Sequence, residues 1–184
     1  MIFIIEGIDR VGKTTLANKL SEKFNIPIYK QERLGGNDVN LDLIAAGNKH
    51  AVDRNIFSNY IRANSLVDFW NSDAFKQNII LDRFHWTESV YSLVDRGSRE
   101  PMQYMACVEA EMLKNKDKYF IIQVMPTDIK RSSAEHGKDL VKHQVEFDML
   151  YDSSRLNKYR CSYGTIDLCI DKVEKLLKEH EVHK

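Results

Sequence analysis

Two kinds of hydrophobic pattern alternate along the chain. Five short apolar runs, the last of them weaker, lie at residues 2–5, 26–29, 78–81, 119–124 and 164–166. Apolar runs of this length, bounded by polar residues, are typical of strands that are buried on both faces of a sheet. The runs therefore predict about five strands.

The second pattern has apolar residues at helical spacing. Within residues 13–24, Leu16, Leu20 and Phe24 recur on one face, with charged residues elsewhere. Comparable patterns predict further helices at 53–70, 87–94, 102–113 and 170–177. Helices that alternate with strands predict an α/β fold, with a parallel sheet of about five strands flanked by helices. Such a sheet binds ligands at the carboxyl ends of its strands.

The composition narrows the function classes. A chain of 184 residues suits a single domain, 1–184. Lys+Arg and Asp+Glu both total 27, and this zero net charge argues against broad binding to nucleic acid. The three cysteines form no CxxC pair, which favours a reducing compartment. The apolar N-terminal segment 1–5 is too short for a signal peptide or a membrane span, so we expect a cytoplasmic protein without a membrane partner.

A phosphate-binding motif lies between the first predicted strand and the first predicted helix. Residues 7–14 read Gly-Ile-Asp-Arg-Val-Gly-Lys-Thr, which fits G-x-x-x-x-G-K-[ST]. Gly7 and Gly12 let the backbone curl so that several N–H groups face one anion, and the helix adds its positive end. The spacing lets Lys13 reach the β- and γ-phosphates of ATP and lets the Thr14 hydroxyl ligate Mg²⁺.

Two charged residues inside this loop suggest catalysis. Asp9 would repel a phosphate unless it orients Mg²⁺ or holds an arginine. The neighbouring Arg10 can reach the transferred phosphoryl group and offset the charge that develops on it. The sequence therefore predicts a kinase whose loop acts on the phosphoryl group as well as binding it.

The loop at residues 6–15, Glu-Gly-Ile-Asp-Arg-Val-Gly-Lys-Thr-Thr, resembles the phosphate loop of thymidylate kinases, and more narrowly of members with an arginine inside it. The resemblance implies the P-loop kinase fold, ATP with Mg²⁺, the conversion of dTMP to dTDP, and a lid near residues 130–145. It also implies the ATP-binding residues Gly7, Asp9, Arg10, Val11, Gly12, Lys13, Thr14, Thr15 and Arg131.

Further motifs extend this resemblance to the acceptor side. Asp82-Arg83 follows the third apolar run and resembles the family's Asp-Arg-Tyr motif, in which the arginine holds the acceptor phosphate. Arg83 therefore joins Lys13, Arg10 and Asp9 as a catalytic residue. Asp82 would orient Arg83 or act with Thr14 at Mg²⁺.

The resemblance implies further contacts with the acceptor substrate, and Asp9 is one of the residues expected to bind it. Glu32 and Arg33 follow the second apolar run and resemble the family's Pro-Glu-Arg segment, whose arginine also binds the acceptor phosphate. The segment around Phe57 and Arg62 resembles the one that reads the pyrimidine base, and Tyr91 stands where the family places an aromatic ring near the sugar. A homodimer is also implied by resemblance.

Two alternatives remain open at the level of sequence. A deoxynucleoside kinase would phosphorylate a 5′-hydroxyl and would need a base such as Glu32. A kinase for a modified pyrimidine monophosphate is the other, because Ser58 stands where the base-reading segment should have its aromatic residue. The Asp-Arg pair inside the loop disfavours the first alternative, and the short chain with its Asp82-Arg83 motif disfavours a nucleotide switch or motor.

Overall fold

The computed structural model describes residues 1–30, 49–136 and 140–182. Five parallel strands form one sheet in the order β2-β3-β1-β4-β5. The elements are β1 Ile2–Glu6, α1 Lys13–Phe24, β2 Ile28–Lys30, α3 Lys49–Asn71, β3 Ile79–Asp82, α4 His85–Arg96, α5 Glu100–Leu113, β4 Tyr119–Met125, α6 Ile129–His136, α7 Val141–Ser153, β5 Asn157–Ser162 and α8 Ile166–Val182. The predicted fold class, a five-stranded parallel α/β sheet, is confirmed.

The three central strands are the strongest apolar runs of the sequence. Every residue of β1 and β3 is buried, as is every residue of β4 except its last. Parallel pairing puts Ile2 beside both Ile79 and Tyr119, so the three strands begin in register. Continuous burial requires cover on both faces of the sheet.

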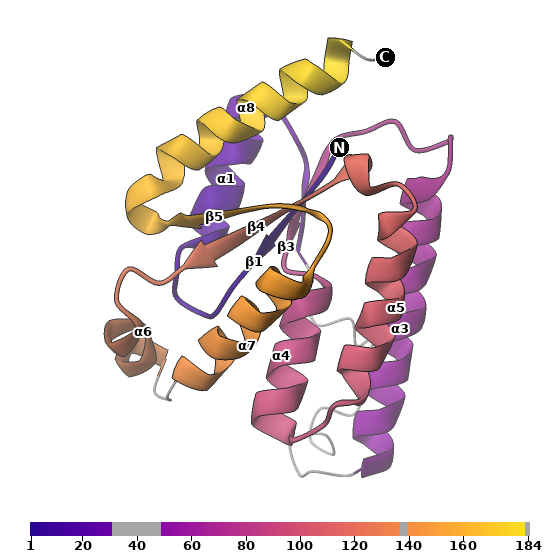
Figure 1. Ribbon diagram of the computed structural model, residues 1–184, viewed down its shortest axis with the longest axis vertical. Helices are drawn as coiled ribbons and strands as arrows, with labels where there is room; N and C mark the ends of the chain where they lie inside the picture. Colours follow the sequence, from indigo (N-terminus) through magenta and orange to yellow (C-terminus); the bar gives the residue numbers. More distant parts are fainter. Residues whose placement is uncertain (31–48, 137–139, 183–184) are drawn as a thin grey trace.

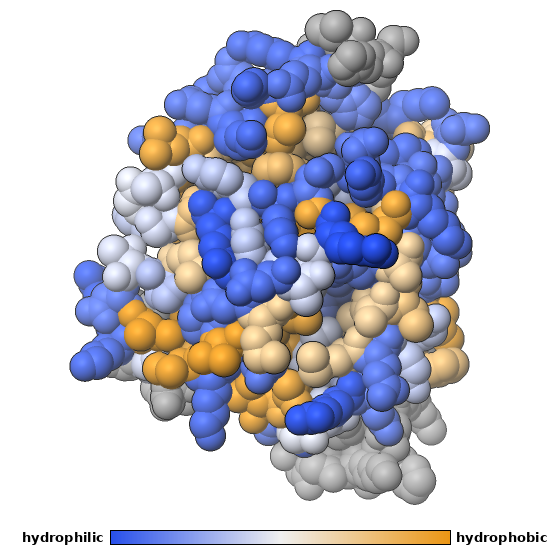
Figure 2. Space-filling model, in the orientation of Figure 1, coloured by the Kyte–Doolittle hydropathy of each residue, from blue (hydrophilic) through white to orange (hydrophobic). Residues whose placement is uncertain are grey.

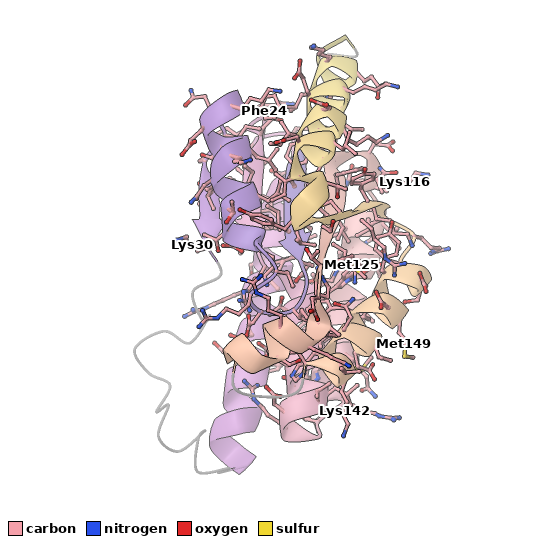
Figure 3. All side chains as sticks on the ribbon, turned by 90° about the vertical axis from the view of Figure 1, so that its left-hand side faces the viewer. Phe24, Lys30, Lys116, Met125, Lys142 and Met149 are labelled. Atoms are coloured by element: carbon pink, nitrogen blue, oxygen red, sulfur yellow. The ribbon has the colours of Figure 1, made fainter. Side chains whose placement is uncertain are left out.

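Helices provide that cover (Figure 1). α1 and α8 pack together on one side of the sheet, and α3, α4, α5 and α7 lie on the other. The largest buried side chains, which include Phe3, Trp86, Tyr119 and Phe147, fill the layers between them. Because all strands are parallel, their carboxyl ends share one edge: Lys30 and Met125, which end β2 and β4, lie at the same height in Figure 3.

The prediction of the last strand was wrong in position. Residues 164–166 form a 3-10 turn, Tyr163–Thr165, and the start of α8, whereas β5 lies at Asn157–Ser162. β5 pairs only with β4 at the edge of the sheet, and only Cys161 in it is buried. An edge strand needs no continuous apolar run, so β5 gave no clear signal in the sequence.

The helices also show how far the chain meets the requirements of a membrane span and of an interface. In the part of the chain that the structure describes, no helix is both long enough and apolar enough to cross a bilayer. α7 exposes Val141, Val145 and Met149 at four-residue spacing, and Figure 2 shows hydrophobic side chains gathered where α7 lies. The homodimer stays a prediction.

Candidate functional site

The loop between β1 and α1 has a backbone that only glycine permits at two positions. Gly7 has φ 138°, and a Cβ there would overlap the Val124 carbonyl oxygen of β4. Gly12 has φ 93°, and a Cβ there would lie 3.0 Å from the Tyr163 ring. Both conformations are strained for residues with a side chain. The loop is therefore held tightly against β4 and the turn after β5.

Lys13 is the first residue of α1 and is buried beneath this loop. Its Nζ donates a hydrogen bond to the Ile8 carbonyl oxygen at 2.5 Å. Burial, reinforced by the positive charge of Arg83, lowers the pKa of Lys13 from 10.5 to about 7. An anion bound in the loop would favour the charged ammonium again. The protonation of Lys13 is therefore expected to increase when a phosphate binds in the loop.

A hydroxyl and a carboxylate meet at the start of α1. Thr14 Oγ1 donates a hydrogen bond to Asp82 Oδ2 at 3.0 Å. Asp82 is 7% exposed, and its Oδ1 is buried without a hydrogen-bond partner among the described residues. Hard oxygen ligands next to a phosphate site suit Mg²⁺, which keeps several waters and needs few protein ligands. The pair fits the magnesium site expected from the sequence, and within the described residues no cluster of three or more acidic, His or Cys ligands exists to hold a metal.

Arg83 turns back from the end of β3 toward the loop. Its backbone has φ 77°, and its N–H donates to the Ile5 carbonyl oxygen at 2.9 Å. Its guanidinium forms an ion pair with Asp9. Although burial opposes the charge, the Asp9 carboxylate raises the pKa of Arg83 above its ordinary value. The structure thus joins two predicted site residues that are 74 positions apart.

Tyr91 joins the same cluster from α4. Its hydroxyl oxygen accepts a hydrogen bond from the Asp9 backbone N–H at 3.1 Å. Burial, and then the negative charge of Asp9, raise the pKa of Tyr91, so its hydroxyl stays protonated at neutral pH. Tyr91 therefore lies beside the Asp9–Arg83 pair, on the acceptor side expected from the sequence.

Glu6 is a site residue that the sequence reasoning did not assign. This fully buried carboxylate ends β1 and accepts hydrogen bonds from the Phe84 and Trp86 backbone N–H groups and from the Thr87 hydroxyl. Burial raises the pKa of Glu6. The contacts cap the start of α4 and fix the turn at Arg83. In the sequence, the signal that could have indicated this role is the position of Glu6, a single acidic residue at the end of the apolar run 2–5.

A cavity of about 470 Å³ opens beside the phosphate loop. Its lining residues come from the loop, the start of α6 and the turn before α8: Arg10, Val11, Gly12, Thr127, Asp128, Arg131 and Tyr163. Arg131 was expected here, but Tyr163 was not, because nothing in its neighbourhood marks it. An aromatic ring and a guanidinium beside a phosphate loop suit the flat base of a nucleotide.

Other expected residues lie elsewhere. Phe57 is 54% exposed and Arg62 is also exposed, both on α3, and neither lines the cavities described here. Thr15 is exposed on α1. Glu32 and Arg33 lie outside the described residues. Part of the expected lid also lies outside the described residues, although α6 is described.

Comparison with known proteins finds solved structures with a similar fold. No protein-family model and no curated protein matches the chain in sequence. YorR from Bacillus subtilis, solved with phosphorylated GDP, is 22% identical with a TM-score of 0.66, over 100% of this chain and 99% of YorR. Deoxyadenosine kinase from M. mycoides, solved with dCMP and dCDP, is 16% identical with a TM-score of 0.60, over 95% of this chain and 100% of that enzyme.

Thymidylate kinase from Candida albicans is also similar in structure, at 17% identity and a TM-score of 0.56, over 100% of this chain and 93% of that enzyme. All these identities are low, so the likeness establishes the fold alone. Together with the phosphate loop, it defines the chain as a protein of the P-loop kinase fold.

Proposed function

We propose that the protein is a nucleoside monophosphate kinase that transfers the γ-phosphoryl group of ATP to dTMP. The observation that carries this proposal is the Asp9–Arg83 ion pair, which holds a guanidinium directly beside the phosphate loop. A cation at that point suits a second phosphate, facing the one in the loop. Transfer between two phosphates requires both to be held in line and neutralised.

The donor side binds ATP through the loop and its neighbours. Backbone N–H groups of the loop and the start of α1 face the β- and γ-phosphates, and Lys13 becomes charged as it meets them. Mg²⁺, when bound, neutralises phosphate charge and orients the γ-phosphoryl group. Thr14 and Asp82 would hold it. The base would lie in the cavity between Arg131 and Tyr163, and the predicted lid would close there.

The acceptor side needs cations more than it needs a base. A monophosphate is already an anionic nucleophile at neutral pH, so no residue has to remove a proton from it. Arg83 would hold its phosphate together with Arg33, as the resemblance to thymidylate kinases implies. Asp9 fixes Arg83, and Arg10 would stabilise charge that develops during transfer. Tyr91 would contact the sugar.

The rival acceptor is a nucleoside 5′-hydroxyl, the kind of acceptor implied by the name of the M. mycoides deoxyadenosine kinase. A hydroxyl needs a base. Glu32, the base named from the sequence, lies outside the described residues. Among the described carboxylates near the loop, Asp9 is paired with Arg83, Asp82 accepts a hydrogen bond from Thr14, and Glu6 accepts hydrogen bonds from three donors. These contacts favour the phosphate acceptor. A modified pyrimidine monophosphate remains an alternative to dTMP.

The test measures ADP release with dTMP, with thymidine, with a panel of other monophosphates, and with no acceptor. Arg83→Met and Arg33→Met should lower kcat/KM for dTMP far more than they change the acceptor-free ATPase rate. Leu168→Ala, an exposed apolar change on α8, serves as the control. If thymidine is the better substrate, or if both arginine variants keep wild-type dTMP kinetics, the monophosphate assignment fails.

A further inference from the structure

A second cavity, of about 280 Å³, opens between the end of β2, the C-terminal half of α3 and the turn after β3. Its lining residues are Tyr29, Lys30, Leu66, Phe69, Trp70, Phe75, Leu81, Arg83 and Phe84. None but Arg83 was assigned a role from the sequence. The volume lies just below the range of drug-sized ligand pockets, about 300–1,000 Å³, and suits the ring portion of a ligand.

Aromatic rings dominate the walls of this cavity. Phe69 and Phe75 meet edge to face with ring centroids 5.4 Å apart, and Trp70 and Phe84 meet at 5.5 Å. Tyr29 and Phe69 remain 56% and 52% exposed. Covering large apolar rings that are in contact with water by a flat partner is energetically favourable. The walls therefore suit a planar ring.

The charges of the cavity indicate what the ring must carry. Among the described residues that line it, the charged ones are Lys30 and Arg83, and both are cationic. Arg83 is also the residue that pairs with Asp9 of the phosphate loop. An occupant with its ring among the aromatic residues can thus place an anionic group at Arg83, facing the loop.

We propose that the base of the acceptor nucleotide binds in this cavity, with its phosphate directed to Arg83. This inference rests on the proposed function and deepens it. In the described part of the walls, the polar side-chain groups besides the two cations are the Tyr29 hydroxyl and the Trp70 indole N–H. The cavity therefore selects its base by shape and stacking more than by hydrogen bonds. Phe57 and Arg62, exposed on α3, are not its reading residues.

The experiment uses Tyr29→Ala and Phe69→Ala, whose side chains are half exposed and so can be shortened without opening the core. Met149→Ala is the matched control: Met149 is 60% exposed and lies on the opposite side of the molecule from Lys30 in Figure 3. Phe57→Ala tests the competing position on α3. Calorimetry measures the binding of dTMP and of 2-deoxyribose 5-phosphate, which lacks the ring, and ADP release measures turnover.

Loss of one stacking ring should weaken dTMP binding by about 5- to 100-fold. The same variants should leave the binding of 2-deoxyribose 5-phosphate unchanged, and Met149→Ala should match the wild type. The inference is overturned if the wild type does not bind dTMP, if neither ring variant weakens binding, or if only Phe57→Ala does. Turnover tests the reaction separately: ring-dependent binding of dTMP without ADP release would sink the kinase proposal and retain the cavity as a nucleotide site.

Discussion

The Thr14 hydroxyl donates its hydrogen bond to Asp82 across 3.0 Å, and this contact joins the first turn of α1 to the end of β3. The two residues are 68 positions apart in the chain. The contact leaves Asp82 Oδ1 buried and unpaired among the described residues, so a donor or a cation there would relieve its desolvation.

Replacing either partner should weaken the response to Mg²⁺. Thr14→Val and Asp82→Asn are each expected to raise the Mg²⁺ concentration for half-maximal ADP release by about 10- to 100-fold. Thr14→Ser keeps the hydroxyl and should stay close to wild type. A magnesium titration of ADP release checks this, and an unchanged midpoint in both variants would remove the pair from the metal site.

Lys13 should make nucleotide binding depend on pH in a predictable direction. Its pKa is about 7 without ligand, and a bound polyphosphate raises it, so binding takes up a proton above pH 7. The affinity for ADP should therefore fall between pH 7.5 and 9, by at most about tenfold per pH unit. Calorimetry in buffers of different ionisation enthalpy measures both the affinity and the proton uptake.

Lys13→Ala supplies the reference for that profile. It should abolish phosphoryl transfer, keep a cooperative unfolding transition, and bind ADP weakly with no loss of affinity over this pH range. Parallel pH profiles for the wild type and the variant would show that Lys13 does not titrate on binding.

Glu6 should contribute to stability in a pH-dependent way. Its pKa in the folded state is raised, so above pH 4.5 the folded protein holds a proton that the unfolded chain has lost. Its contribution to stability therefore falls as pH rises from 4.5 through the folded-state pKa. Glu6→Gln removes this fall, whereas Glu6→Ala leaves buried N–H groups unpaired at about 1–3 kcal/mol each. Urea unfolding at several pH values measures both, and equal pH dependence in wild type and Glu6→Gln would refute the assignment.

The sequence predicted features formed by neighbouring residues better than contacts between residues far apart in the chain. The apolar runs located β1, β3 and β4, because strands buried on both faces must be apolar throughout. The position of β5 was missed because an edge strand escapes that demand. The phosphate loop was found because the eight adjacent residues 7–14 form its motif. Glu6 and Tyr163 were missed because their roles come from contacts with α4 and with Gly12, which no local pattern encodes.

Arg10 allows a test that separates strain from catalysis. It has φ 64°, a left-handed conformation that costs a residue with a side chain about 1–2 kcal/mol. Arg10→Gly should relieve this strain, whereas Arg10→Ala keeps it. We therefore expect the glycine variant to be at least as stable as the alanine variant in urea unfolding. Both variants lose the guanidinium, so any difference in activity between them reports on the loop backbone.

If Arg10 acts on charge that develops during transfer, both variants should lower kcat by about 10²–10³ with small changes in either KM. The structure offers a competing role, because Arg10 also lines the donor cavity with Arg131 and Tyr163. A residue that only binds the donor would raise the KM for ATP and leave kcat intact. Steady-state kinetics with ATP and dTMP varied in turn distinguish the two. A pure rise in the ATP KM for both variants would assign Arg10 to donor binding and leave the developing charge to Lys13 and Arg83.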